Sequence, residues 1–154
     1  METIRVSVEG PVEESAEKVY GYIADNREHH PHFLPPAISD FEVESGGVGA
    51  GTITTFKLDA GGRSRRFRMQ TAEPEPGRVL TESDKNSSLV TTFTVTPEGG
   101  SSRVTISTTW EGAGGIGGFF ERLFAPRVMR RIYEDELRRL NEYARERTRQ
   151  GPSA

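Results

Sequence analysis

A glycine-rich passage at residues 111–118 divides this chain into two unlike parts. Before it, short segments that alternate apolar and polar residues indicate mostly β-strands; after it, the sequence predicts one long amphipathic helix. The helix has to bury its apolar stripe, and only the preceding strands can cover that stripe. Because a curved sheet closed by a single helix is suited to enclosing a cavity, we expect a protein that binds a lipophilic small molecule.

The composition is that of one folded domain. The chain has 154 residues, of which 33% are hydrophobic and 28% charged, with a net charge of −3. We expect a single domain at residues 1–149 and a disordered tail at residues 150–154. No stretch approaches the roughly 20 apolar residues that cross a bilayer, and the first residues lack the basic start of a signal peptide. Cysteine is absent, which is compatible with a reducing compartment. From these features together we expect a cytoplasmic protein without stable membrane insertion. The oligomeric state does not follow from the sequence.

Two features that suggest phosphate or nucleic acid have simpler interpretations. Residues 46–51 read GGVGAG, but Thr52 stands where a dinucleotide-binding pattern needs glycine, and a strand follows instead of a helix. The last helix is weakly basic, but acidic residues interleave with its arginines, which is typical of a solvated face. We therefore expect a hairpin turn at residues 46–51, no nucleic acid partner and no cofactor.

The first third of the chain predicts a strand and a helix. Residues 3–8 alternate apolar and polar side chains, and Gly10-Pro11 is expected to end this strand. Apolar residues at helical spacing from Val12 to Ile23 then predict a helix that ends at Asp25-Asn26. Residues 27–36, interrupted by three prolines, form a short connector with room for one helical turn.

Six more strands are expected, at residues 37–45, 51–59, 63–72, 77–83, 88–96 and 102–111. The short Gly-, Pro- and Asn-containing linkers between them predict antiparallel hairpins. One face of the sheet is apolar and the other carries mainly Thr, Ser and Arg. The apolar face comprises Phe41, Val43, Phe56, Leu58, Phe67, Met69, Leu89, Phe93, Val95, Val104, Ile106 and Trp110.

The long helix should begin near Pro126, a residue suited to a first turn, and run to about residue 147. A short segment at about residues 117–125 precedes it, and residues 112–118 form either a hinge or a plain turn. The helix stripe consists of Val128, Met129, Ile132, Tyr133, Leu137, Leu140 and Ala144.

This order of elements is similar to the helix-grip fold of the START/SRPBCC superfamily, in its polyketide cyclase/dehydrase and lipid-transport branch. The segments that carry the resemblance are residues 8–25 (VEGPVEESAEKVYGYIAD), 46–52 (GGVGAGT), 74–80 (PEPGRVL) and 97–105 (PEGGSSRVT). The resemblance implies an α+β fold in which a curved antiparallel sheet of about seven strands wraps a long C-terminal helix, with two short helices after the first strand. Members bind sterols, lipids, polyketides, hormones or quinones, and a minority catalyse aldol cyclisation or dehydration.

Residues 28–33, EHHPHF, hold every histidine of the chain. Imidazoles can ligate a metal or transfer protons near neutral pH. Pro31 breaks the helical spacing, so the three rings are not expected to converge, and we expect no metal site. In the superfamily this connector lies near the cavity mouth, so His29, His30 or His32 is either a ligand contact or a solvated loop residue; we nominate His32.

An arginine and a glutamate are placed on the apolar face of the sheet. Arg65 shares a face with Phe67 and Met69, and a buried charge is costly unless it is paired. Glu82 is a candidate partner. Either side chain could bind a ligand carboxylate or carbonyl, or both could lie at the sheet rim.

We expect the cavity to bind a lipid, a polyketide or another aromatic or isoprenoid compound. Two alternatives stay open: a polyketide cyclase or dehydratase-like enzyme, and a protein-interaction module whose cavity is filled by aromatic side chains. No catalytic residue is assigned. The candidate ligand-binding residues are Phe56, Phe67, Met69, Phe93, Trp110, Tyr133, Arg65, Glu82, His32 and Met129.

Overall fold

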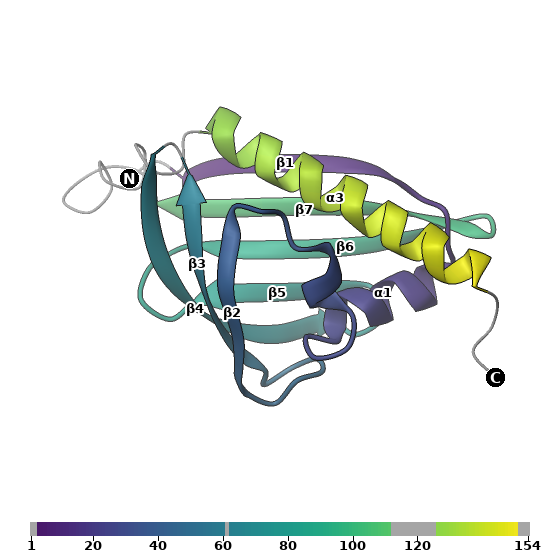
Figure 1. The fold of residues 1–154 in the computed structure, drawn as a ribbon, viewed down its shortest axis with the longest axis horizontal. Coiled ribbons are helices and arrows are strands. Elements are labelled where there is room, and N and C mark those ends of the chain that lie inside the picture. The colour runs from purple at the N-terminus through teal and green to yellow at the C-terminus, as the bar shows by residue number, and fades with distance from the viewer. Residues whose placement is uncertain (1–2, 61, 112–125, 151–154) are drawn as a thin grey trace.

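A seven-stranded antiparallel sheet curves around one long helix (Figure 1). The structure is a computed structural model that describes residues 3–60, 62–111 and 126–150. The sheet order is β1-β7-β6-β5-β4-β3-β2, and α1 and the 3-10 helix η1 lie between β1 and β2 in the chain. The bounds are β1 Thr3–Val12, α1 Ala16–Ala24, η1 His30–Phe33, β2 Ile38–Ser45, β3 Ile53–Ala60, β4 Arg63–Glu75, β5 Val79–Asp84, β6 Val90–Glu98, β7 Ser101–Glu111 and α3 Pro126–Arg149.

The predicted α+β helix-grip fold is confirmed. The seven strands and the long C-terminal helix are present, and the two short helices expected after the first strand are one α-helix, α1, and one 3-10 helix, η1. The expected segment at residues 117–125, the hinge or turn at 112–118 and the tail beyond residue 150 lie outside the described residues. The domain limits therefore stay a prediction.

The end of β1 was predicted wrongly. Gly10-Pro11 does not stop the strand, because Gly10 pairs with Val104 and Pro11 with Arg103, and β1 continues to Val12. Proline is tolerated there because β1 is an edge strand, which has one side without a ladder partner. The helix α1 accordingly begins later than expected, at Ala16, with the Ser15 hydroxyl accepting a hydrogen bond from the Lys18 N–H at 3.4 Å.

Gly10 sits where α3 crosses β1. A Cβ atom at this position would lie 3.1 Å from Leu137 Cδ2, so the absence of a side chain lets the helix approach the strand closely. Leu137 is half-buried. The fully buried stripe of α3 runs instead through Met129, Tyr133, Glu136, Leu140 and Ala144.

Of two further turn regions, the one at residues 46–52 agrees with the prediction and the one near Pro74 does not. Residues 46–52 connect the antiparallel strands β2 and β3, as expected of a hairpin turn. Gly49 in this turn has φ +69°, and a Cβ there would lie 2.7 Å from Glu73 Oε2. β4 is longer than expected: it passes Pro74 and ends at Glu75, with a register shift between Ala72 and Glu75 that accommodates the proline.

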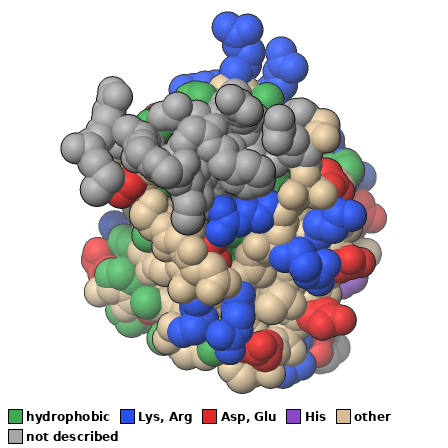
Figure 2. All heavy atoms as spheres, turned by 90° about the vertical axis from the view of Figure 1, so that its left-hand side faces the viewer, with side chains coloured by type: hydrophobic (Ala, Val, Ile, Leu, Met, Phe, Trp, Pro, Cys, Tyr) green, Lys and Arg blue, Asp and Glu red, His purple; other side chains and the backbone are tan. Residues whose placement is uncertain are grey.

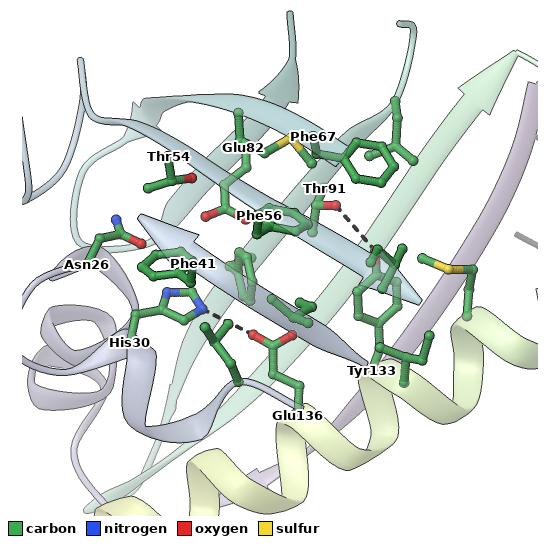
Figure 3. Close-up of a pocket in the computed structure, with 18 residues that line it drawn as sticks. Asn26, His30, Phe41, Thr54, Phe56, Phe67, Glu82, Thr91, Tyr133 and Glu136 are labelled. Carbon is green, nitrogen blue, oxygen red and sulfur yellow. Dashed lines mark hydrogen bonds and ion pairs between the residues drawn. The ribbon is translucent and has the colours of Figure 1, made fainter. Parts of the chain in front are cut away.

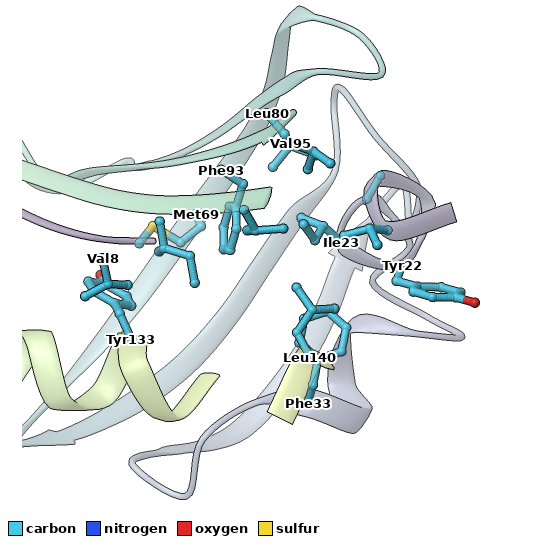
Figure 4. Close-up of a cluster of buried hydrophobic side chains, with 14 of the residues drawn as sticks. Val8, Tyr22, Ile23, Phe33, Met69, Leu80, Phe93, Val95, Tyr133 and Leu140 are labelled. Carbon is cyan, nitrogen blue, oxygen red and sulfur yellow. The ribbon is translucent and has the colours of Figure 1, made fainter. Parts of the chain in front are cut away.

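Buried side chains fill the space between the sheet, α1 and α3 (Figure 4). Near α1, this core contains Ile23, Leu80, Val95, Phe33 and Leu140, each 1% exposed or less. The outer face of the sheet is polar and carries ion pairs, among them Arg68–Glu44 at 2.7 Å and Arg66–Asp40 at 3.3 Å. In Figure 2, basic side chains stand beside acidic ones on the face shown. A cavity remains between the inner face of the sheet and the middle of α3.

Candidate ligand-binding site

A cavity of about 50 Å³ lies between the inner face of the sheet, η1 and α3 (Figure 3). Its walls are mainly aromatic and sulfur-containing side chains: Phe41, Phe56, Phe67, Phe93, Met69 and Met129. This volume holds a few water molecules and is far smaller than the roughly 300–1,000 Å³ of pockets that hold drug-sized ligands. A larger ligand therefore requires the walls to move apart.

An open groove of about 580 Å³ adjoins the cavity. The groove and the cavity share four lining residues, Asn26, Leu34, Ile38 and Phe41. The groove is also lined by Pro31 of η1 and by Pro35 and Pro36, which follow η1. Leu34, Ile38 and Phe41 are only half-buried. These residues therefore form the boundary between the groove and the cavity.

His30 and Glu136 form a buried pair at the cavity wall. His30 Nε2 lies 3.1 Å from Glu136 Oε2, and the two side chains are 3% and 4% exposed. His30 comes from η1, where its ring stacks on Phe33 with centroids 4.6 Å apart. Glu136 comes from the buried stripe of α3, one turn after Tyr133. The pair thus ties η1 to the centre of the helix.

The hydrogen bonds of His30 determine its protonation. Nδ1 lies 2.7 Å from the carbonyl oxygen of Ile23, which can only accept, so Nδ1 carries a proton. Burial alone lowers the pKa of His30, but the hydrogen bond to Glu136 and the charges of Glu136 and Glu82 outweigh it, and the pKa is raised above its ordinary value. The raised pKa favours the imidazolium form of His30, which donates from both nitrogens, to Ile23 and to Glu136.

Glu82, on β5, points into the cavity (Figure 3). Burial raises the pKa of this carboxyl; the charge of His30 lowers it and the charge of Glu136 raises it further. Within the described part of the chain, its carboxylate has no hydrogen bond or ion pair. Glu82 is therefore an inward carboxyl whose environment favours the protonated form more than water does.

Asn26 contributes a second inward polar group, its side-chain oxygen. It follows α1 and is 2% exposed; its backbone N–H donates to the carbonyl of Gly47 at 2.8 Å. Nδ2 donates to the carbonyl of Ala24 at 3.4 Å, which distinguishes the amide nitrogen from the oxygen. Oδ1 has no hydrogen-bond partner in the described residues, and it faces the cavity.

Tyr133 supplies the polar group of the opposite wall. Its hydroxyl accepts a hydrogen bond from Thr108 and lies 3.4 Å from Thr91 Oγ1, while the two threonine hydroxyls are 2.9 Å apart. Burial raises the pKa of Tyr133 to about 12, although both threonine hydrogen bonds act in the opposite direction. The phenol therefore stays protonated and acts as a neutral hydrogen-bonding group.

Most of the predicted site residues line the cavity: Phe56, Phe67, Met69, Phe93, Tyr133, Glu82 and Met129. The exceptions are Arg65, Trp110 and His32. Trp110 is buried in the core at 1% exposure, away from the cavity lining.

Arg65 does not pair with Glu82. Its Nη2 lies 3.6 Å from Asp84 Oδ2, and its guanidinium lies over the Phe67 ring. The register of β4 and β5 explains the difference: Asp84 stands opposite Met69 and Glu82 opposite Thr71, so Asp84 is the nearer of the two acids to Arg65.

His32 is exposed and stacks on Tyr143 of α3, with ring centroids 5.6 Å apart. His29 also contacts Tyr143, with Nδ1 2.7 Å from the phenol oxygen. The histidine that reaches the cavity is His30. No cluster of three or more metal-ligating side chains occurs in residues 3–60, 62–111 and 126–150.

The sequence interpretation missed Glu136 and Asn26 and chose His32 instead of His30. Glu136 carried a readable signal, because it lies three residues after Tyr133 and four before Leu140, on the same helix face. A glutamate at such a position needs a partner in the interior. No comparable signal marks Asn26, which reads as a helix terminator.

Comparisons with known proteins agree with this architecture. Residues 3–145 match the model of the family described as polyketide cyclase/dehydrase and lipid transport. The NMR structure of the KanY protein is 35% identical, with a TM-score of 0.83, over 94% of this chain and 99% of that one. No curated protein matches the sequence.

More distant structures share the fold alone. The ZhuI aromatase/cyclase from Streptomyces sp. R1128 is 16% identical with a TM-score of 0.76, over 99% of this chain and 100% of that one. The protein TTHA0849 from Thermus thermophilus is 22% identical with a TM-score of 0.74, over 92% and 97%. No helix in the described residues is both long and apolar enough to span a membrane. On the extent of the family match and the likeness to KanY, the chain belongs to the polyketide cyclase/dehydrase and lipid transport family of the SRPBCC superfamily.

Proposed function

We propose that this protein binds a hydrophobic small molecule, such as a lipid, a polyketide or another aromatic or isoprenoid compound, in the cavity between the sheet and α3. One observation carries the proposal: beside aromatic walls and the paired His30 and Glu136, the cavity contains two inward polar groups, the Glu82 carboxyl and Asn26 Oδ1, that have no hydrogen-bond partner among the described residues. An unpaired buried polar atom such as Asn26 Oδ1 is costly, and a ligand that donates a hydrogen bond to it recovers that cost. The absence of cysteine is compatible with a cytoplasmic site of action.

The affinity would come mainly from burial of the ligand's apolar surface, at about 25 cal/mol per Å² before ordering costs are subtracted. The polar groups at the two walls would set its orientation. Because the cavity is narrow, a ligand has to displace the aromatic side chains that line it. Binding should therefore be slower than diffusion allows.

Native mass spectrometry of gently purified protein, before and after organic extraction, tests this proposal. We expect either a retained lipophilic mass that extraction removes, or uptake from a panel of fatty acids, sterols, quinones and aromatic polyketides. Met129→Phe adds bulk inside the cavity and should reduce uptake. Val48→Phe adds the same ring at a loop residue that is 65% exposed and should not. If no member of the panel binds, the proposal is wrong and a protein-interaction role is favoured.

A polyketide cyclase or dehydratase-like activity is a second candidate, favoured by the three ionisable side chains His30, Glu82 and Glu136 at one cavity. In an intramolecular aldol step, a base removes a proton from the carbon between two carbonyls, that carbon attacks a further carbonyl, and an acid protonates the oxygen. A carboxyl with a raised pKa, as Glu82 has, is suited to the acid role near neutral pH. Loss of turnover with unchanged substrate binding in Glu82→Gln would support this activity; unchanged turnover would exclude Glu82 from it.

A further inference from the structure

Hydrogen-bond acceptors outnumber donors at the end of the cavity next to η1 and β5. Asn26 Oδ1 and the Glu82 carboxylate have no partner among the described residues, and Glu136 uses Oε2 for His30. Both nitrogens of His30 are already engaged, by Ile23 and Glu136. Thr54 supplies the neighbouring hydroxyl (Figure 3). A molecule that complements this end must bring N–H or O–H donors.

The charges at this end of the cavity also favour a ligand that brings a positive charge. Two carboxylates, Glu82 and Glu136, face one imidazolium, His30, and no lysine or arginine occurs among the described residues that line the cavity. Arg65 is already paired with Asp84. An ionised Glu82 therefore leaves one negative charge without a cation.

The cavity walls also suit a positive charge. Phe41, Phe56, Phe67 and Phe93 line it, and the Phe56 and Phe67 rings lie 5.6 Å apart, between centroids. The faces of aromatic rings attract ammonium groups, most strongly where water is excluded. Aromatic walls with an acceptor-rich, negatively charged end match an organic cation better than a neutral lipid.

We propose that the ligand is a primary or secondary amine on an apolar, aromatic body, with its ammonium group at Asn26 Oδ1 and Glu82 and its body between the phenylalanine rings. This inference rests on the proposed function, because it names the class of molecule that the same cavity holds. The ammonium N–H groups satisfy both unpartnered acceptors, and its charge neutralises the Glu82 carboxylate.

The affinity for such an amine should rise with pH. An amine with a pKa near 10 keeps its charge across the neutral range. Glu82, whose pKa is raised, must lose its proton to pair with the ammonium, and His30, which faces it from η1, repels the ammonium less once deprotonated. Glu136 faces both groups from α3, where it is paired with His30. A neutral ligand that accepts a hydrogen bond from protonated Glu82 would show the opposite trend.

Calorimetric titration with matched probes tests the inference: phenethylamine against phenethyl alcohol, and naphthylmethylamine against naphthalenemethanol. In the wild-type chain we expect the Kd of each amine to be lower than that of its alcohol by a factor of about ten or more, because the ammonium group adds about one charge-assisted hydrogen bond. Glu82→Gln should remove this preference, because it removes the carboxylate that pairs with the ammonium group. Glu42→Gln makes the same charge change at an exposed residue of β2 and should keep the preference.

The outcomes separate this inference from the proposed function. Equal binding of amine and alcohol to the wild-type chain, or an amine affinity that falls as pH rises, overturns the amine assignment and leaves hydrophobic binding standing. The wild-type comparison and its pH profile need no variant, so they decide the matter even if Glu82→Gln fails to fold. If neither probe of either pair binds while the neutral lipophilic panel does, the amine assignment is wrong; if nothing binds, both proposals are.

Discussion

Replacing Glu136 with glutamine should destabilise the protein in a way that depends on pH. The His30–Glu136 contact is 3.1 Å long between side chains that are 3% and 4% exposed. Stranding one charge of a buried pair costs about 3–5 kcal/mol. His30 avoids that cost by losing the Nε2 proton, after which the introduced amide N–H donates to Nε2. The net loss is then the difference between a charge-assisted and a neutral hydrogen bond, about 1 kcal/mol.

The sign of the pH dependence follows from His30. Its pKa is raised in the folded protein, so the pair stabilises fully below the unfolded value, about 6.5, and that contribution is lost as pH rises through the folded value. The wild-type chain should therefore exceed Glu136→Gln in Tm by about 2–4 °C near pH 6. Well above the pKa of His30 in the folded protein, the difference in Tm should vanish or reverse, because the wild-type Glu136 carboxylate then faces the lone pair of the neutral imidazole.

Thermal unfolding followed by circular dichroism measures the Tm difference between the two proteins at about pH 6 and at about pH 9. Glu142→Gln is the matched control, a glutamate on the same helix with a side chain 60% exposed and paired with Arg138. It should shift Tm by little at either pH. Glu82 also faces the pair and has a raised pKa, but it is present in all three proteins. A difference between wild type and Glu136→Gln that is the same at both pH values would refute the ionised His30–Glu136 pair.

Two further substitutions test the packing. Gly10→Ala places a Cβ 3.1 Å from Leu137 Cδ2, and we expect it to lower the free energy of unfolding, measured in urea, by about 1 kcal/mol. The loss should be smaller when Leu137→Ala is also present. An equal loss with and without Leu137→Ala would show that this contact is not the cause. Tyr133→Phe removes the hydroxyl that contacts Thr108 and Thr91. We expect it to lower the free energy of unfolding by about 1–2 kcal/mol. If no loss is measured, the two threonine hydroxyls satisfy each other without the phenol.

The fold was predictable because its two periodicities are strong in the sequence. Alternation marked the inner face of the sheet, and helical spacing marked Met129, Tyr133 and Leu140 on α3, which lie where the pattern places them. The aromatic wall of the cavity followed from the same alternation. The boundary error at Gly10-Pro11 arose because local turn chemistry was weighed without β7, whose ladder holds the edge strand extended.

The polar part of the site was harder to predict because its contacts join distant parts of the chain. Glu136 and His30 are 106 residues apart, so neither residue shows locally that the other neutralises it. The choice among three histidines depends on how η1 turns. This 3-10 helix directs His30 inward and His32 towards Tyr143, and Pro31 between them concealed that geometry.

The pairing of the first strand with the last has a consequence for synthesis of the chain. Thr3 stands opposite Glu111 and Val12 opposite Ser102, so β1 has no ladder partner until β7 has left the ribosome. At roughly 5–20 residues per second, that delay is on the order of 5–20 s. Throughout it, the alternating apolar residues Ile4, Val6 and Val8 remain on an unpaired strand edge, the kind of segment that associates with other chains. The nascent N-terminus is therefore where a chaperone would most increase the yield of folded protein.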